Sequence, residues 1–178
     1  MAKSYQGLIY SLNVSDGGVP KWPIESATIN ALGITEDHQS DHGAHGGPIR
    51  ALCLYSVEVL QALAEEGHDV YPGATGENIT LEGIDWDIVR PGARLRLGEQ
   101  VLIEITSFTE PCWKNACWFT DGDYSRMDDA VFPGWARVYA KVIEGGEVQR
   151  GQRAEVIPET AMDRIARLSI RTINYTPN

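Results

Sequence analysis

Residues 93–107 read ARLRLGEQVLIEITS, and this stretch decides the fold class. Leu95 and Leu97 alternate with arginines, and a second alternating run follows the polar segment Gly98-Glu99-Gln100, over Val101–Ser107. Alternation of period two places apolar side chains on one face of an extended chain. The stretch therefore predicts two strands joined by a short turn.

Similar strand patterns recur on both sides of this stretch. Residues 5–14 alternate, which predicts a strand with Leu8, Tyr10, Leu12 and Val14 on one face. We expect further strands at Ser26–Ile29 and Ile49–Tyr55, and a hairpin of 134–143 with 147–157 turned by Gly145-Gly146.

Helical patterns are fewer. Ser56 is a suitable N-cap for a helix that runs to Glu66, with Val59, Leu60 and Leu63 directed inward and Gly67 as the stop signal. The tail from residue 158 to 178 has helical spacing as well. Six to eight strands with one or two helices predict a mainly β fold, a strand-rich closed or nearly closed β-barrel.

The composition limits the number of domains, the partners and the cellular location that we expect. The chain has 178 residues, 43% of them hydrophobic, and a net charge of −10. We expect a single domain over 1–178, and no nucleic-acid partner, because the acidic balance repels phosphate. No apolar run is long enough to span a membrane, and the N-terminus lacks a secretory signal. Three cysteines then favour a reducing compartment, so we expect a cytoplasmic protein.

A glycine-rich stretch between residues 35 and 50 is the first candidate site. His45-Gly46-Gly47-Pro48-Ile49-Arg50 allows backbone N–H groups to cradle an anion beside the positive charge of Arg50. The same residues are equally compatible with a plain turn into a buried strand. His38, His42 and His45 are a weak candidate metal site, because the glycines around them disfavour the helix that would align them.

Two further segments carry reactive or polar groups. Gly76-Glu77-Asn78 offers a carboxylate and an amide that can orient a heterocycle, or else can form a self-satisfied turn. Cys53 lies in an apolar run and is expected to be a core thiol. Cys112 follows a strand and precedes Lys114, in a segment where a thiol can be exposed, and a half-buried structural thiol is the alternative. Cys117 is a candidate resolving thiol. Cationic candidates for an anion pocket are Arg50, Lys114, Arg126 and Arg137.

The order of these motifs resembles that of the MOSC domain, the family named after the C-terminal domain of molybdenum-cofactor sulfurase. The motifs are Asp41-x-x-x-His45-Gly-Gly-Pro-x-Arg-Ala, Gly76-Glu-Asn-Ile-Thr, Pro91-Gly-x-x-Leu-x-Leu-Gly98, Pro111-Cys112, Arg137-Val and Gly146-x-Val-x-x-Gly151. The resemblance covers about residues 26–157. Thr109 and Glu110 stand where many relatives carry a basic residue before the cysteine.

The resemblance implies a β-barrel that binds a molybdopterin-type molybdenum cofactor. In this reading Cys112 is the essential cysteine and the molybdenum ligand, and a soft thiolate suits that metal. The residues implied to contact the cofactor are His45, Gly46, Gly47, Arg50, Glu77, Asn78 and Lys114. No pyridoxal-phosphate site of its own is expected.

Three functions remain open from the sequence. The first is a molybdenum-dependent reductase of N-oxygenated small molecules, supplied with electrons by a separate flavin or iron–sulfur protein. The second is a non-catalytic sulfur carrier that takes persulfide sulfur onto Cys112 from a pyridoxal-phosphate cysteine desulfurase. The third, a cysteine hydrolase using Cys112, His45 and Asp41, lacks any known local signature.

Overall fold

Eleven strands in the described part of the chain form one large and one small sheet. The computed structural model describes residues 3–38 and 46–158. The strands of the large sheet are β1 (Gln6–Val14), β2 (Trp22–Ile24), β5 (Leu52–Ser56), β6 (Ile79–Glu82), β7 (Arg94–Leu97), β8 (Val101–Phe108), β9 (Val138–Glu144) and β11 (Arg153–Ile157). Those of the small sheet are β3 (Ser26–Asn30), β4 (Gly33–Ile34) and β10 (Gly146–Gln149).

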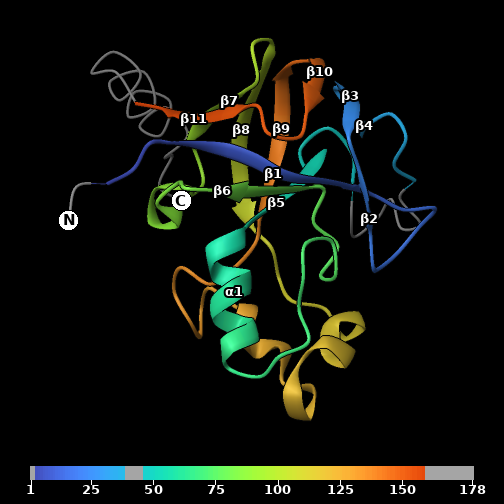
Figure 1. Cartoon of the computed structure of the whole chain (residues 1–178), viewed down its shortest axis with the longest axis vertical. Coiled ribbons are helices and arrows are strands. Elements are labelled where there is room, and N and C mark those ends of the chain that lie inside the picture. The colour runs from blue at the N-terminus through green and yellow to red at the C-terminus, as the bar shows by residue number, and fades with distance from the viewer. Residues whose placement is uncertain (1–2, 39–45, 159–178) are drawn as a thin grey trace, which may run out of the picture.

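The large sheet closes on itself. Its order is β11-β7-β8-β9-β5-β6-β1-β2, and an additional antiparallel pairing of β11 with β1 completes a ring of seven strands, with β2 attached at the edge. Closure removes the exposed strand edges that would otherwise pair with other chains. The expected mainly β barrel is confirmed, and Figure 1 shows the strands wrapped around each other above the helical part of the chain.

One strand pair in the barrel is parallel. β5 and β6 run in the same direction, with Leu54 opposite Ile79. A parallel pair needs a crossover connection, and here helix α1 (Val57–Glu65) begins that connection. In Figure 1, α1 lies below the barrel, beside the short 3₁₀-helices η2 (Trp113–Trp118), η3 (Thr120–Gly122) and η4 (Tyr124–Met127). Another 3₁₀-helix, η1 (Trp86–Ile88), follows β6.

Helix α1 begins where the sequence predicts. The Ser56 side chain accepts hydrogen bonds from the backbone N–H groups of Glu58 and Val59. Leu60 and Leu63 are buried, as expected, whereas Val59 is only half-buried. No helix in the described residues is long and apolar enough to cross a membrane.

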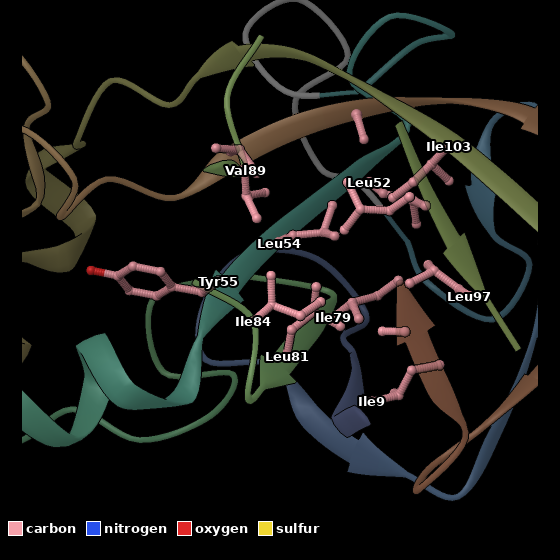
Figure 2. Packing of buried hydrophobic residues seen from close by; sticks show 14 of the residues in the cluster. Ile9, Leu52, Leu54, Tyr55, Ile79, Leu81, Ile84, Val89, Leu97 and Ile103 are labelled. Carbon is pink, nitrogen blue, oxygen red and sulfur yellow. The ribbon is translucent and has the colours of Figure 1, made fainter. Parts of the chain in front are cut away.

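The core lies inside the ring of strands. Figure 2 shows Leu52 and Leu54 of β5, Ile79 and Leu81 of β6, Leu97 of β7 and Ile103 of β8 among the buried side chains that fill it. Each of these residues has at most 1% of its surface exposed. Burying a side chain of this size stabilises the fold by about 1.5–3 kcal/mol relative to leaving it in water.

The hairpin over residues 93–107 is confirmed, because β7 pairs antiparallel with β8. The predicted hairpin of 134–143 with 147–157 is wrong. β9 pairs with β5 and β8, β10 with β3, and β11 with β7 and β1. Neither Gly145 nor Gly146 has the positive φ that a tight hairpin turn requires. Instead a Cβ on Gly145 would lie 2.5 Å from the carbonyl oxygen of Ile29, so this glycine lets the chain cross closely over β3.

Two other expectations fail in detail. Leu8 of β1 is 44% exposed while Ile9 is fully buried, because an irregularity between Ile9 and Ser11 shifts the alternation of the strand. Ile49 lies outside β5 and is 66% exposed, since the strand begins at Leu52. The predicted C-terminal helix lies outside the described residues.

Candidate functional site

A cavity opens at the end of the barrel where β1 and β8 finish and β6 and β9 begin. Its volume is about 710 Å³ when the open mouth is included. Segments from the whole length of the chain line it, namely Gly18, Val19, Lys21, Asp37, His38, Gly46, Arg50, Cys53, Thr75, Gly76, Asn78, Cys112, Lys114, Asn115, Arg137 and Tyr139. The cavity therefore depends on the closed barrel that brings these segments together.

Cys112 stands at one wall of this cavity, at the N-cap of η2. The chain leaves β8 at Phe108, and the Thr109 N–H donates to the Arg137 carbonyl, which holds the segment against the start of β9. The Asn115 N–H then donates to the Cys112 carbonyl and starts the turn. Cys112 is half-buried, whereas Cys117 is exposed and does not line the cavity. The structure thus distinguishes the two thiols of this segment.

A buried ion pair forms another wall. The Lys21 Nζ lies 2.6 Å from the carboxylate oxygens of Asp37, and the two side chains are 9% and 2% exposed. Asp37 also accepts hydrogen bonds from the Ser15 N–H and the Asn78 Nδ2. The network ties the segment that follows β4 to the end of β1 and to the start of β6.

Two buried polar side chains of the lining have atoms without a partner. Arg137 is 6% exposed and donates through Nη1 to the carbonyl of Thr75, but its Nε has no hydrogen-bond partner among the described residues. Asn115 is 3% exposed, and its Oδ1 also has none within that part of the chain. Buried polar atoms are normally satisfied, and a ligand or a water molecule in the cavity is one way to supply the missing partners.

A cation–π pair and a second thiol complete the site. The Arg50 guanidinium lies over the Tyr139 ring, 5.5 Å from its centroid. Burial raises the pKa of Tyr139 to about 12, so its hydroxyl keeps its proton at neutral pH. Burial likewise raises the pKa of Cys53 to about 11, against the opposing effect of Arg137. Cys53 therefore faces the cavity as a neutral thiol.

The structure brings together most of the residues proposed from the sequence. Cys112, Gly46, Arg50, Asn78 and Lys114 all line the cavity. Gly47 follows Gly46 with a φ of +77° but is not part of the lining.

Glu77 faces away from the cavity into the protein, where it is fully buried. His45, as well as Asp41 and His42, lies outside the described residues, and no group of three potential metal ligands occurs among those described. Of the cationic candidates, Arg126 does not line the cavity, since it packs on Trp135 and pairs with Glu66.

Several lining residues were missed by the sequence analysis. Lys21 and Asp37 carry no motif, and their pairing across 16 positions appears only in the fold. Asn115 and Tyr139 were missed for the same reason, although each lies within two or three residues of a candidate, Cys112 or Arg137.

The charge of the lining contrasts with that of the whole protein. Four cationic side chains face the cavity, with Asp37 as the one carboxylate among its described lining residues. The cations are Lys21, Arg50, Lys114 and Arg137. In a chain of net charge −10, this concentration favours an anionic ligand.

The sequence that forms this barrel and its cavity matches one family model. A model described as the MOSC domain matches residues 41–155. The chain belongs to the MOSC domain family. The matched range contains the cavity-lining residues from Gly46 to Tyr139, and Lys21, Asp37 and His38 lie upstream of it.

Two relatives of known sequence share this MOSC domain. The chain is 30% identical over 154 residues to "Uncharacterized protein YflK" of Bacillus subtilis (strain 168), an alignment covering 85% of this chain and 68% of that protein. It is 31% identical over 134 residues to "Protein YiiM" of Escherichia coli (strain K12), covering 72% of this chain and 58% of YiiM. The chain thus spans little more than half the length of YiiM.

Solved structures share the fold. The YUAD protein from Bacillus subtilis superposes with a TM-score of 0.69 at 18% identity, covering 90% of this chain and all of that one. YiiM from Geobacillus stearothermophilus superposes with a TM-score of 0.66 at 20% identity, covering 95% of this chain and 86% of that one. At these identities the likeness establishes the MOSC architecture alone.

Proposed function

We propose that this MOSC protein binds a molybdopterin-type molybdenum cofactor and reduces N-oxygenated small molecules, such as hydroxylamino bases. The observation that carries the proposal is the convergence in one cavity of the Cys112 thiol, four cationic side chains and two buried polar atoms without partners. MOSC domains are associated in general with molybdenum-cofactor binding, which supports this choice of ligand.

The residues present fit such a group. Cys112 supplies the soft sulfur ligand that a molybdenum–sulfur centre prefers. Cys53, the second thiol of the lining, is held neutral by burial, so Cys112 is the better ligand. Arg137 and Asn115 line the cavity, and a guanidinium can donate to a ring carbonyl or a phosphate oxygen while an amide can pair with a ring N–H. Arg50 and Lys114 add positive charge toward a phosphate.

The bound cofactor would supply the redox chemistry that breaks an N–O bond. Reduction of a hydroxylamino group consumes two electrons and two protons, and it yields an amine and water. The chain's own groups would position the substrate and donate hydrogen bonds, and the protonated hydroxyl of Tyr139 in the cavity wall suits that role. We propose that a separate flavin or iron–sulfur protein supplies the electrons. The free thiols support a cytoplasmic location for the protein.

Elemental mass spectrometry tests the proposal directly. Wild type and Cys112→Ala are expressed in a host that makes the cofactor, and Cys117→Ala is the matched control, because it removes the neighbouring thiol outside the cavity. We expect molybdenum in wild type and Cys117→Ala, and its loss in Cys112→Ala. Reduction of a hydroxylamino base by an artificial electron donor should follow the same pattern. Wild-type protein that folds but retains no molybdenum would refute cofactor binding.

A sulfur-carrier role is the alternative, favoured by the partial exposure of Cys112 at the cavity wall. A partner enzyme can reach a thiol in that position. Incubation with a pyridoxal-phosphate cysteine desulfurase and cysteine should then add one sulfur atom to Cys112, seen by mass spectrometry, and none to Cys112→Ala. Absence of the adduct on wild type, where a known persulfide acceptor is modified, would exclude this role.

A further inference from the structure

Glu77 is a buried carboxyl group directly behind the cavity wall, and its hydrogen bonds are all to neutral groups. Its Oε1 accepts from the Gly73 N–H at 2.7 Å and from the Thr80 hydroxyl at 3.3 Å. Its Oε2 lies 2.7 Å from the Thr75 hydroxyl. The side chain is fully buried and has no ion pair among the described residues. Such a group pays a large desolvation cost when it is charged.

The network around Glu77 accommodates either protonation state. A threonine hydroxyl both donates and accepts, so Thr75 can donate to a carboxylate or accept from a protonated Oε2 in the same position. The Gly73 N–H bond to Oε1 is unchanged by this exchange. Burial raises the pKa of Glu77, against the hydrogen bonds from Gly73 and Thr75 that lower it.

Thr75 also connects Glu77 to the cavity. Its carbonyl accepts a hydrogen bond from Arg137 Nη1, and Arg137 is one of the residues that line the cavity. Cys53 and Tyr55 carry no charge at neutral pH, since burial raises the pKa of Cys53 to about 11 and raises that of Tyr55 as well. Lys21 is neutralised by Asp37. Arg137 and Glu77 are therefore the two groups whose charges act on each other here.

We propose that Arg137 and Glu77 form a proton-linked oxyanion site, in which a bound anion favours neutral Glu77 and ionised Glu77 weakens anion binding. With Glu77 neutral, the full charge of Arg137 acts on a phosphate or sulfate group in the cavity. With Glu77 ionised, the buried carboxylate offsets that charge. The inference shares one premise with the proposed function, which is that the cavity takes an anionic ligand. Glu77 is then a positioning residue that acts through Arg137.

Sulfate is the probe of choice, because its charge is constant between about pH 5 and 9, unlike that of phosphate. Binding to the full chain, made in a host without the cofactor, is measured by calorimetry at constant ionic strength. All proteins carry His38→Gln, which removes the exposed histidine of the lining. We expect sulfate affinity to fall on the order of tenfold as pH rises through the titration of Glu77, the size typical of one close charge pair. In Glu77→Gln the affinity should stay at its low-pH value.

Arg137→Gln is the matched control and should abolish sulfate binding at every pH. The same pH dependence in Glu77→Gln as in its parent, or no sulfate binding by the parent, would overturn the inference. Reciprocal linkage gives a second readout that needs no substitution at Glu77. Carbon-13 NMR of labelled glutamate should show sulfate raising the pKa of Glu77, and an unchanged titration would refute the coupling. Molybdenum content plays no part in these experiments, so their failure is distinguishable from failure of the proposed function.

Discussion

The buried pair of Lys21 and Asp37 gives the sharpest stability prediction. Removing one member of a buried ion pair leaves the other uncompensated, at a cost of about 3–5 kcal/mol. The structure predicts an asymmetry within that range. In Lys21→Met, Asp37 keeps hydrogen bonds from the Ser15 N–H at 2.8 Å and the Asn78 Nδ2 at 2.9 Å, so we expect a loss of about 3 kcal/mol in the free energy of unfolding. In Asp37→Leu, the contact that Lys21 retains among the described residues is a weak one with the Ser15 hydroxyl at 3.5 Å, so we expect a loss of about 5 kcal/mol in the free energy of unfolding.

Urea and thermal unfolding measure these losses. At about 2–4 °C per kcal/mol for a chain of this size, the two variants should melt roughly 6–20 °C below wild type. The double variant should be more stable than the sum of the single losses implies, because no buried charge is left alone. Glu155→Gln is the control, since its pair with Arg153 is exposed and worth less than about 1 kcal/mol. Losses in the single variants no larger than in this control, or strict additivity in the double variant, would refute the reasoning.

Three further predictions test the fold. Leu54→Ala should destabilise the barrel by about 2–5 kcal/mol in urea unfolding, because Leu54 is fully buried, and a loss under about 1 kcal/mol would contradict its placement. Gly73→Ala should lower the free energy of unfolding by at least about 2 kcal/mol, since a Cβ there lies 2.3 Å from a backbone oxygen and φ is +90°. In the control Gly67→Ala the Cβ meets no atom, so only the strain of a positive φ remains and the loss should be about 1 kcal/mol. Equal losses in the two variants would contradict the clash at Gly73. Burial acts to raise the pKa of Glu104, but hydrogen bonds from Lys141 and an arginine outweigh it, so the pKa is lowered. Glu104 thus contributes stability at neutral pH that is lost as pH falls through this lowered pKa. Glu104→Gln should lower the free energy of unfolding by under about 1 kcal/mol at neutral pH and by nothing in strong acid. A loss that persists in strong acid would contradict the ion pair.

Local patterns in the sequence predicted the elements that depend on local interactions. The hairpin over 93–107 and the Ser56 cap of α1 follow from alternation and capping within a few residues. The Gly145-Gly146 segment was misread because its role is set by close contact with Ile29, which the sequence cannot reveal. Leu8 was assigned to the wrong face because an irregularity in pairing with another strand shifts its phase.

The same distinction between local motifs and contacts set by the fold applies to the candidate site. Cys112, Arg50, Lys114 and Asn78 were found because each belongs to a compact motif, and the fold places them in one cavity. The functions assigned to them stay predictions. Glu77 belongs to a motif too, but its direction relative to the cavity depends on the conformation of the preceding loop, which no spacing rule encodes.

Closure of the barrel through β1 and β11 has a consequence for the order of events in the cell. β1 begins at Gln6 and β11 ends at Ile157, so the pairing that completes the ring joins nearly the two extremes of the described chain. The cavity walls come from loops at one end of this ring, from Gly18 to Tyr139. The ring at whose end these walls meet can close only after β11 has been synthesised.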